Sequence, residues 1–127
     1  MPLAVDASAI AAIVFGEPEG QELANYCTGE TLVAPTLLDF ELANIGLKKI
    51  RRKLRRRADV IAAMQVAQGL RIERIAVPAV DALALADRTG LTAYDAAYLW
   101  VAIARDAELV TLDDDLARVN DQLREHF

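Results

Sequence analysis

Four acidic residues spread along the chain are placed so that their carboxylates could meet at one site: Asp6, Glu41, Asp95 and Asp113. Two of them follow apolar runs, at residues 3–5 and 109–112, that are typical of buried strands. These two acids are therefore expected near the carboxyl ends of strands. The other two fall in the first turns of expected helices.

The residue types indicate the chemistry of such a site. In an open parallel α/β sheet, ligands bind in the crevice beyond the carboxyl ends of the strands. Carboxylates that converge there without His or Cys suit a hard cation such as Mg²⁺ or Mn²⁺. A cation held in this way can activate water and stabilise charge on a leaving oxygen. The pattern therefore predicts metal-assisted cleavage of a phosphodiester.

Each acid also has a simpler interpretation. Asp6 and Asp113, taken singly, are typical N-caps of the helices that follow them. Glu41 alone is typical of a solvated helix surface, and Asp95 alone is typical of the acidic end of a capping box.

The neighbours of these acids favour the shared site. Ser8 lies two residues after Asp6 and could orient its carboxylate through a hydrogen bond. Asn44 shares a helix face with Glu41 in a mainly apolar segment, where buried polar groups need partners. Asp95 precedes a wholly apolar run, so the start of that helix is expected to lie against the core.

The composition favours one soluble domain over residues 1–127. It is 54% hydrophobic and 26% charged, as in globular rather than disordered proteins. No targeting or membrane segment is expected, because the apolar uncharged run at 96–104 is far shorter than the roughly 20 residues that cross a bilayer. The single Cys27 cannot form an internal disulfide, which fits a reducing cytoplasm.

A dense basic stretch interrupts an otherwise acidic chain. Residues 48–57 hold eight of the 14 Lys and Arg residues, although the net charge is −5. A solvated helix surface and a contact with a polyanion both remain open, since like charges at this density repel one another. The stretch is expected to lie beside the acidic site and to steer RNA towards it. Four arginines are candidates for contact with RNA or with a protein partner: Arg51, Arg52, Arg55 and Arg56.

The expected elements alternate strands with helices, which predicts the α/β class with a mostly parallel central sheet flanked by helices. Strands are expected at residues 3–5, 31–34, 72–77 and 109–112. Helices are expected at residues 8–15, 19–27, 36–53, 55–68, 79–89, 95–105 and 114–119. Capping-box patterns at 36–39 and 92–95 mark two of the helix starts.

Four motifs together resemble the PIN domain family and, within it, the VapC-type toxins of toxin–antitoxin pairs. They are Val-Asp-Ala-Ser at 5–8, Glu-Leu-Ala-Asn at 41–44, Tyr-Asp-Ala-Ala-Tyr-Leu at 94–99 and Leu-Val-Thr-Leu-Asp at 109–113. They occur in the family's order, with family-like spacings over almost the whole chain. The resemblance implies a PIN-like three-layer fold, although the last strand usual in the family is hard to see after Val119.

The resemblance also implies a role for each acid. The four acids match the quartet that holds Mg²⁺ or Mn²⁺ in the family, with Asp6 and Asp95 as the first choice of direct ligands. Glu41 and Asp113 are expected to bind directly, through water, or to a second ion. Supporting roles are expected for Ser8, Asn44, Thr111 and, as a frequent extra acid, Asp115.

The implied activity is that of a Mg²⁺-dependent endoribonuclease that cuts single-stranded RNA through metal-activated water. The implied partners are a second copy, forming a homodimer, and a VapB-type antitoxin whose tail folds across the active-site groove. The aromatic residues Tyr94, Tyr98 and Trp100 give modest further support for an interface.

Two alternatives remain. The chain could be a non-catalytic nucleic-acid-binding or regulatory module that uses residues 48–57. It could also be a phosphotransferase with Asp6 as its nucleophile, but Ser8 stands where such enzymes want a second Asp.

Overall fold

The computed structural model describes residues 1–125, which form four strands and seven helices. In chain order these are β1 (Leu3–Val5), α1 (Ala7–Val14), α2 (Gly20–Cys27), β2 (Leu32–Pro35), α3 (Leu38–Arg51), α4 (Arg57–Gly69), β3 (Ile72–Ile75), α5 (Ala79–Thr89), α6 (Ala93–Ala104), β4 (Glu108–Val110) and α7 (Asp114–Glu125). The alternation of strands and helices expected from the sequence is confirmed.

All four strands are parallel and lie in the order β3-β2-β1-β4. Leu3 of β1 pairs with Leu32 of β2 on one side and with Glu108 of β4 on the other. The chain therefore adds β2 and β3 on one side of β1 and then returns to add β4 on the opposite side. The crevice between β1 and β4 is the kind of reversal point at which open α/β sheets bind ligands.

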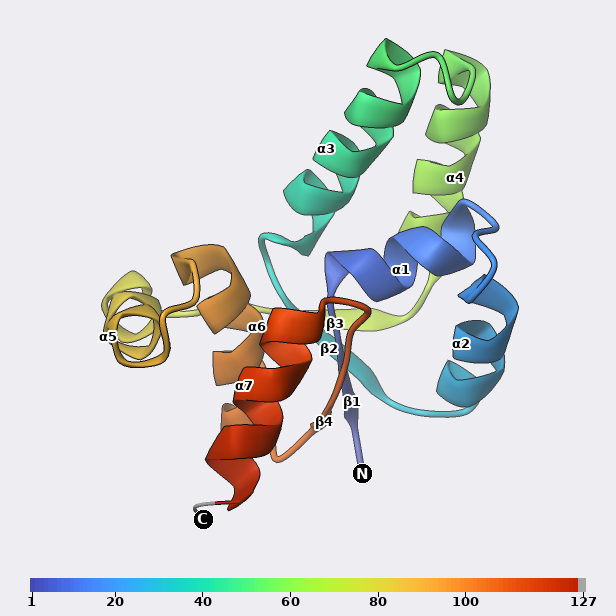
Figure 1. Cartoon of the computed structure of the whole chain (residues 1–127). Coiled ribbons are helices and arrows are strands. Elements are labelled where there is room, and N and C mark those ends of the chain that lie inside the picture. Colours follow the sequence, from blue (N-terminus) through green and yellow to red (C-terminus); the bar gives the residue numbers. More distant parts are fainter. Residues whose placement is uncertain (126–127) are drawn as a thin grey trace.

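Helices pack on both faces of the sheet (Figure 1). On one face α6 packs against β1, β2 and β4 and is itself covered by α5 and α7, while α1 packs with α2, α3 and α4. Leu3 and Val5 join the larger core cluster, whereas Ala4 packs in a second cluster with Val33 and Val101. This division follows from the alternation of side chains along a strand. The predicted fold class, an α/β three-layer arrangement, is confirmed.

α3 and α4 form a helical hairpin that extends away from the sheet, with its tip at residues 52–56 (Figure 1). Gly46 allows the two helices to approach closely, because a Cβ atom there would lie 2.7 Å from Cγ1 of Val60. At the tip, Lys53 adopts a left-handed backbone conformation with φ of 57°. The basic stretch therefore occupies the end of this hairpin.

Two helix boundaries differ clearly from the sequence-based expectations. α3 begins at Leu38, and no side chain caps it, so the predicted capping box at 36–39 is wrong. α7 runs to Glu125 instead of ending at 119, because Leu116 and Val119 continue a buried helical face. Since residues 114–125 are helical, the described part of this region contains no final strand.

No helix within residues 1–125 is both long and apolar enough to cross a membrane. The single domain over residues 1–127 stays a prediction.

Candidate active site

Asp6 is the buried centre of the candidate site. It directly follows β1, is only 5% exposed, and caps α1 by accepting the Ala9 amide on Oδ1 at 3.0 Å. The Ser8 hydroxyl donates to the same oxygen at 2.7 Å, and the Thr111 hydroxyl donates to Oδ2 at 2.5 Å. Three donors therefore fix the orientation of this carboxylate. The helix-cap interpretation of Asp6 holds, and it does not compete with a place at the site.

The segment after β4 lies directly beside Asp6. The Asp6 amide donates to the Val110 carbonyl at 3.2 Å. Asp113 caps α7, since its Oδ1 accepts from the Leu116 amide at 3.0 Å. The Asp113 amide in turn donates to the Thr111 hydroxyl at 2.9 Å. Thr111 thus connects Asp6 to Asp113 across the point where the strand order reverses.

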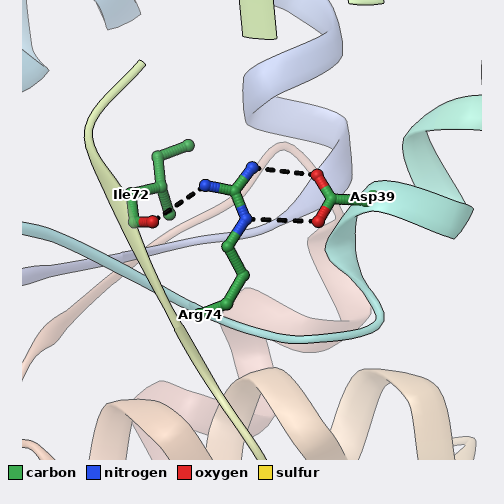
Figure 2. Close-up of polar contacts among 3 residues, drawn as sticks. All are labelled: Asp39, Ile72 and Arg74. Carbon is green, nitrogen blue, oxygen red and sulfur yellow. Dashed lines mark hydrogen bonds and ion pairs between the residues drawn. The ribbon is translucent and has the colours of Figure 1, made fainter. Parts of the chain in front are cut away.

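Glu41 lies half-buried in the first turn of α3, and a neighbouring acid ties this turn to the sheet. Arg74 of β3 donates to Asp39 twice, from Nη2 to Oδ1 at 2.8 Å and from Nε to Oδ2 at 3.2 Å. Its Nη1 donates to the Ile72 carbonyl at 2.8 Å (Figure 2). Such a bidentate pair fixes an angle as well as a distance. Asp39 is therefore committed to β3, while Glu41, two residues later, faces another direction around the helix.

Asp95 lies half-buried in the first turn of α6. The Thr92 hydroxyl caps this helix by accepting the Asp95 amide at 3.1 Å, so the predicted cap at this helix start is confirmed. The next four residues, 96–99, are all buried. The start of α6 is therefore anchored in the core, as the apolar sequence predicted.

Burial and neighbouring carboxylates raise the pKa of Asp6, Glu41 and Asp95. For Asp6, burial raises the pKa most, the charge of Asp113 adds to it, and the three hydrogen bonds oppose it. For Glu41, burial again raises the pKa most, and the charges of Asp95 and Asp6 add to it. For Asp95, burial is followed by the charges of Asp113 and Asp6. None of the four ion pairs found in residues 1–125 involves these acids, so their charges lack a cationic side chain as partner.

Helix starts supply part of the compensation. α1 begins after β1, α3 after β2 and α7 after β4, all at the same end of the parallel sheet (Figure 1). The partial positive charge of a helix N-terminus favours a nearby anion. Asp6 and Asp113 use this directly by accepting amide protons of α1 and α7.

Tyr98 belongs to this site, although its role was not evident from the sequence. Its ring is 1% exposed, and its hydroxyl is buried without a hydrogen-bond partner in the described part of the chain. The hydroxyl nevertheless lies close enough to Glu41 to lower the pKa of that carboxyl, and burial together with the Glu41 carboxylate raises the pKa of Tyr98. The available signal was its spacing of three residues from Asp95, which puts both on one face of α6.

Asn44 and Asp115, two of the predicted supporting residues, lie at the edge of the site. Asn44 is exposed on α3. Asp115 is exposed, pairs with Arg118 at 3.1 Å, and contributes least among the causes that raise the pKa of Asp95. Their supporting roles stay predictions.

The basic stretch does not lie beside the acids. Glu41 is at the start of α3 and Arg51 at its end, roughly 15 Å apart along the helix axis. The stretch therefore stands one helix length away from the carboxylates, at the hairpin tip seen in Figure 1.

Part of the basic stretch serves the fold itself. Lys49 pairs with Glu17 at 2.5 Å and lies 5.2 Å from the centroid of the Phe15 ring. Arg55 donates to the Phe15 carbonyl at 2.8 Å. The other predicted arginines are exposed, and contact with RNA or a partner stays a prediction for them: Arg51, Arg52 and Arg56.

The chemistry of the four acids fits a hard divalent cation. They offer only oxygen ligands, and a divalent charge would relieve the repulsion that, after burial, raises the pKa of Asp6, Glu41 and Asp95. Within residues 1–125, however, no three acidic side chains lie close enough together to form a preformed metal-binding site. An ion would therefore have to draw the other carboxylates towards Asp6, whose orientation is already fixed.

Comparison with known proteins gives consistent similarities. The PIN domain family matches residues 3–122. Ribonuclease VapC3 of Pyrobaculum aerophilum is 34% identical over 122 residues, which cover 92% of this chain and 93% of that protein. Ribonuclease VapC9 of Mycobacterium tuberculosis is 33% identical over 112 residues, covering 87% and 85%. The crystal structure of PAE2754 from Pyrobaculum aerophilum has a TM-score of 0.72 and 26% identity, covering 94% of this chain and 84% of that one.

Proposed function

The chain belongs to the PIN domain family, and from that premise we propose that it is a Mg²⁺-dependent endoribonuclease acting as the toxin of a toxin–antitoxin pair. Its similarity to proteins named VapC ribonucleases supports the activity and the role. One observation carries the chemistry: burial and the charges of neighbouring site acids raise the pKa of Asp6, Glu41 and Asp95, and none of the three has a cationic side chain as partner in residues 1–125.

Asp6 is the first ligand in this proposal. A carboxylate has about four acceptor sites, and the three hydrogen bonds to Asp6 leave one for a cation. Asp95 is the second direct ligand, while Glu41 and Asp113 complete the site directly or through water. Outer hydrogen bonds of this kind fix the orientation of a ligand before the ion arrives.

When bound, the cation would supply Lewis acidity towards the phosphodiester and favour ionisation of an attacking water. The residues of the chain hold the carboxylates in position. The cap of α1 and the Thr111 hydroxyl keep Asp6 in one orientation, and the cap of α7 does the same for Asp113. The Asp39–Arg74 pair holds the turn that carries Glu41.

RNA is the proposed substrate, and a VapB-type antitoxin and a second copy of the chain are the proposed partners. Of the three aromatic residues near the third motif, Tyr98 is part of the core, so it is not available to an interface. The proposed homodimer therefore needs its own measurement. Light scattering that gives the mass of a monomer at micromolar concentration would contradict it.

A non-catalytic nucleic-acid-binding module is the second candidate function. It is favoured by the exposed arginines at the hairpin tip, which form a positive surface apart from the acids. Such a module would bind RNA equally well after the acids are neutralised, whereas a nuclease would lose turnover.

The test measures cleavage of total RNA by the wild-type chain and by Asp95→Asn, with Mg²⁺, with EDTA, and with Mn²⁺ added after EDTA. Asp95→Asn keeps the size of the side chain and removes one ligand charge, so cleavage is expected to fall by at least about 100-fold. EDTA should abolish cleavage, and Mn²⁺ should restore it. Calorimetry with Mn²⁺ gives an independent readout, because the variant should also bind the ion more weakly.

The matched control is Asp114→Asn, which removes the same charge from an exposed neighbour of the cluster. It should cleave and bind Mn²⁺ as the wild type does. Cleavage that persists in EDTA, or an Asp95→Asn chain that cuts normally, would contradict the metal-nuclease proposal.

A further inference from the structure

Three exposed apolar side chains stand immediately before three of the site acids. Phe40 precedes Glu41 and is 83% exposed, the largest exposure of any large apolar side chain in residues 1–125. Tyr94 precedes Asp95 and is 64% exposed, and Leu112 precedes Asp113 and is 42% exposed. Single exposed apolar residues are ordinary on protein surfaces. Here, however, three exposed apolar residues each lie one position before an acid of the site, which indicates a shared role.

These side chains do not contribute to the core. In residues 1–125 neither core cluster includes Phe40, Tyr94 or Leu112. A phenylalanine ring contributes to stability chiefly through burial, so packing gives no reason for a ring at position 40. The two rings remain available to a ligand.

The position of Phe40 is fixed by its neighbours on both sides. Asp39 is held against β3 by Arg74 (Figure 2), and Glu41 is half-buried at the acid cluster. Successive side chains on a helix point about 100° apart, so Phe40 projects from the rim between these two fixed directions. Tyr94 occupies the same place relative to Asp95 in the first turn of α6.

We propose that Phe40 and Tyr94 are stacking platforms for unpaired bases on either side of the phosphate presented to the acids. The inference rests on the proposed ribonuclease function. Consecutive Cα atoms are only about 3.8 Å apart, so a phosphate that reaches Glu41 or Asp95 brings its flanking nucleotides within reach of the preceding ring. Every base offers a π-face to an aromatic side chain, and in single-stranded RNA that face is accessible.

The arrangement favours RNA over a protein partner. Specific protein interfaces bury a total of about 1,200 Å² or more, whereas each of these apolar side chains is followed directly by an acid in the sequence. A nucleotide chain carries a base beside each charged phosphate, and here a ring precedes each of two acids, as Phe40 precedes Glu41 and Tyr94 precedes Asp95. The rings would thereby hold the substrate, while the acids act on its phosphate.

The experiment compares Phe40→Ala, Tyr94→Ala and the double variant with the wild type. Steady-state cleavage of a short single-stranded RNA gives KM and kcat in Mg²⁺, and fluorescence anisotropy gives the Kd of the same labelled RNA in EDTA at low salt. Each alanine variant should raise KM and Kd by roughly 5- to 150-fold, with little change in kcat. Val80→Ala, at a 75% exposed position on α5, is the control and should change neither constant.

Two further variants separate stacking from general apolar contact. Phe40→Trp should keep the Kd of the wild type, whereas Phe40→Leu should bind as weakly as Phe40→Ala. All the substituted positions are exposed, so circular dichroism and Tm should be unchanged.

The outcomes separate this inference from the proposed function. Wild-type cleavage with KM and Kd unchanged in the ring variants overturns the stacking role and leaves the nuclease intact. Ring-dependent RNA binding without any cleavage supports stacking and overturns the nuclease. Unchanged RNA binding accompanied by loss of self-association overturns the inference and assigns the rings to a protein interface. A chain that neither cleaves nor binds RNA overturns both.

Discussion

Asp39 and Arg74 join the first turn of α3 to β3 through two parallel hydrogen bonds, although 35 residues separate them in the sequence. The pair is partly exposed, with 25% of the Arg74 side chain and 44% of the Asp39 side chain accessible. Solvent screening therefore limits its contribution to stability. Its larger effect is geometric, because the turn that it holds carries both Phe40 and Glu41.

Removing the charge of either Asp39 or Arg74 is expected to have a small effect on the stability of the fold and a larger effect on the rate of RNA cleavage. Arg74→Gln and Asp39→Asn should each lower the free energy of unfolding by about 1 kcal/mol or less, measured by urea denaturation. Cleavage should fall by roughly tenfold or more, because the Glu41 turn loses its tether. The double variant should be no worse than either single variant. Additive losses would show that the two residues do not act as a pair.

The acid cluster should make stability depend on pH. The pKa of Asp95 is raised in the folded state above its ordinary value of 3.8, by burial and by neighbouring charges. The folded chain therefore holds this proton more tightly than the unfolded chain, and stability falls as pH rises through the folded pKa. In EDTA, Asp95→Asn should be more stable than the wild type at pH 7, and the difference should shrink towards pH 4 and below.

Urea unfolding at several pH values measures this difference, with Asp114→Asn as the control for net charge. A stability difference between Asp95→Asn and the wild type that stays constant across pH would mean that the substitution acts through packing and not through charge.

Tyr98→Phe should shift the pH dependence of cleavage. The Tyr98 hydroxyl lowers the pKa of Glu41, so its removal should raise that pKa and move the acidic limb of the pH–rate profile to higher pH. A lower rate with an unshifted profile would contradict a link between Tyr98 and Glu41.

The hairpin tip can be tested through salt. Replacing Arg51, Arg52 and Arg56 together with Gln should weaken RNA binding and reduce the slope of log Kd against log salt by about 2, given roughly 0.7 per phosphate contact on a single strand. Arg55 is left in place because it bonds to the Phe15 carbonyl. Arg71→Gln, at an exposed position directly before β3, is the control. If the triple variant keeps the wild-type slope, the tip contacts the antitoxin or only solvent.

The neighbourhood of Asp6 could be predicted from the sequence because its determinants are local. An apolar strand, an acid and a serine two residues later define a strand end, a helix cap and a hydrogen bond, and all three are present. The place of Thr111 beside them required only that β4 lie next to β1. That neighbour relation is usual in parallel α/β sheets.

The errors arose where long-range contacts override local patterns. Thr36 and Asp39 have the spacing of a capping box, but Asp39 finds Arg74, a charged partner that local reasoning cannot see. The C-terminal helix was expected to end at 119 because polar residues follow. Leu123, however, packs against the core one turn after Val119 and continues the helix. The basic stretch was expected beside the acids, and only the length and direction of α3 place it elsewhere.

The partners of Asp6 come from opposite ends of the chain: Ser8 is two residues away, and Thr111 is 105 residues away. We therefore expect the site to be among the last parts of the molecule to form during folding, because loop closure over such a separation is slow. A chain emerging from the ribosome would lack the complete site until Thr111 had been made. The Asp6 amide, bonded to the Val110 carbonyl, reports this event directly. Pulsed hydrogen exchange should show its protection arising after that of α3 and α4, and early protection would refute this order of assembly.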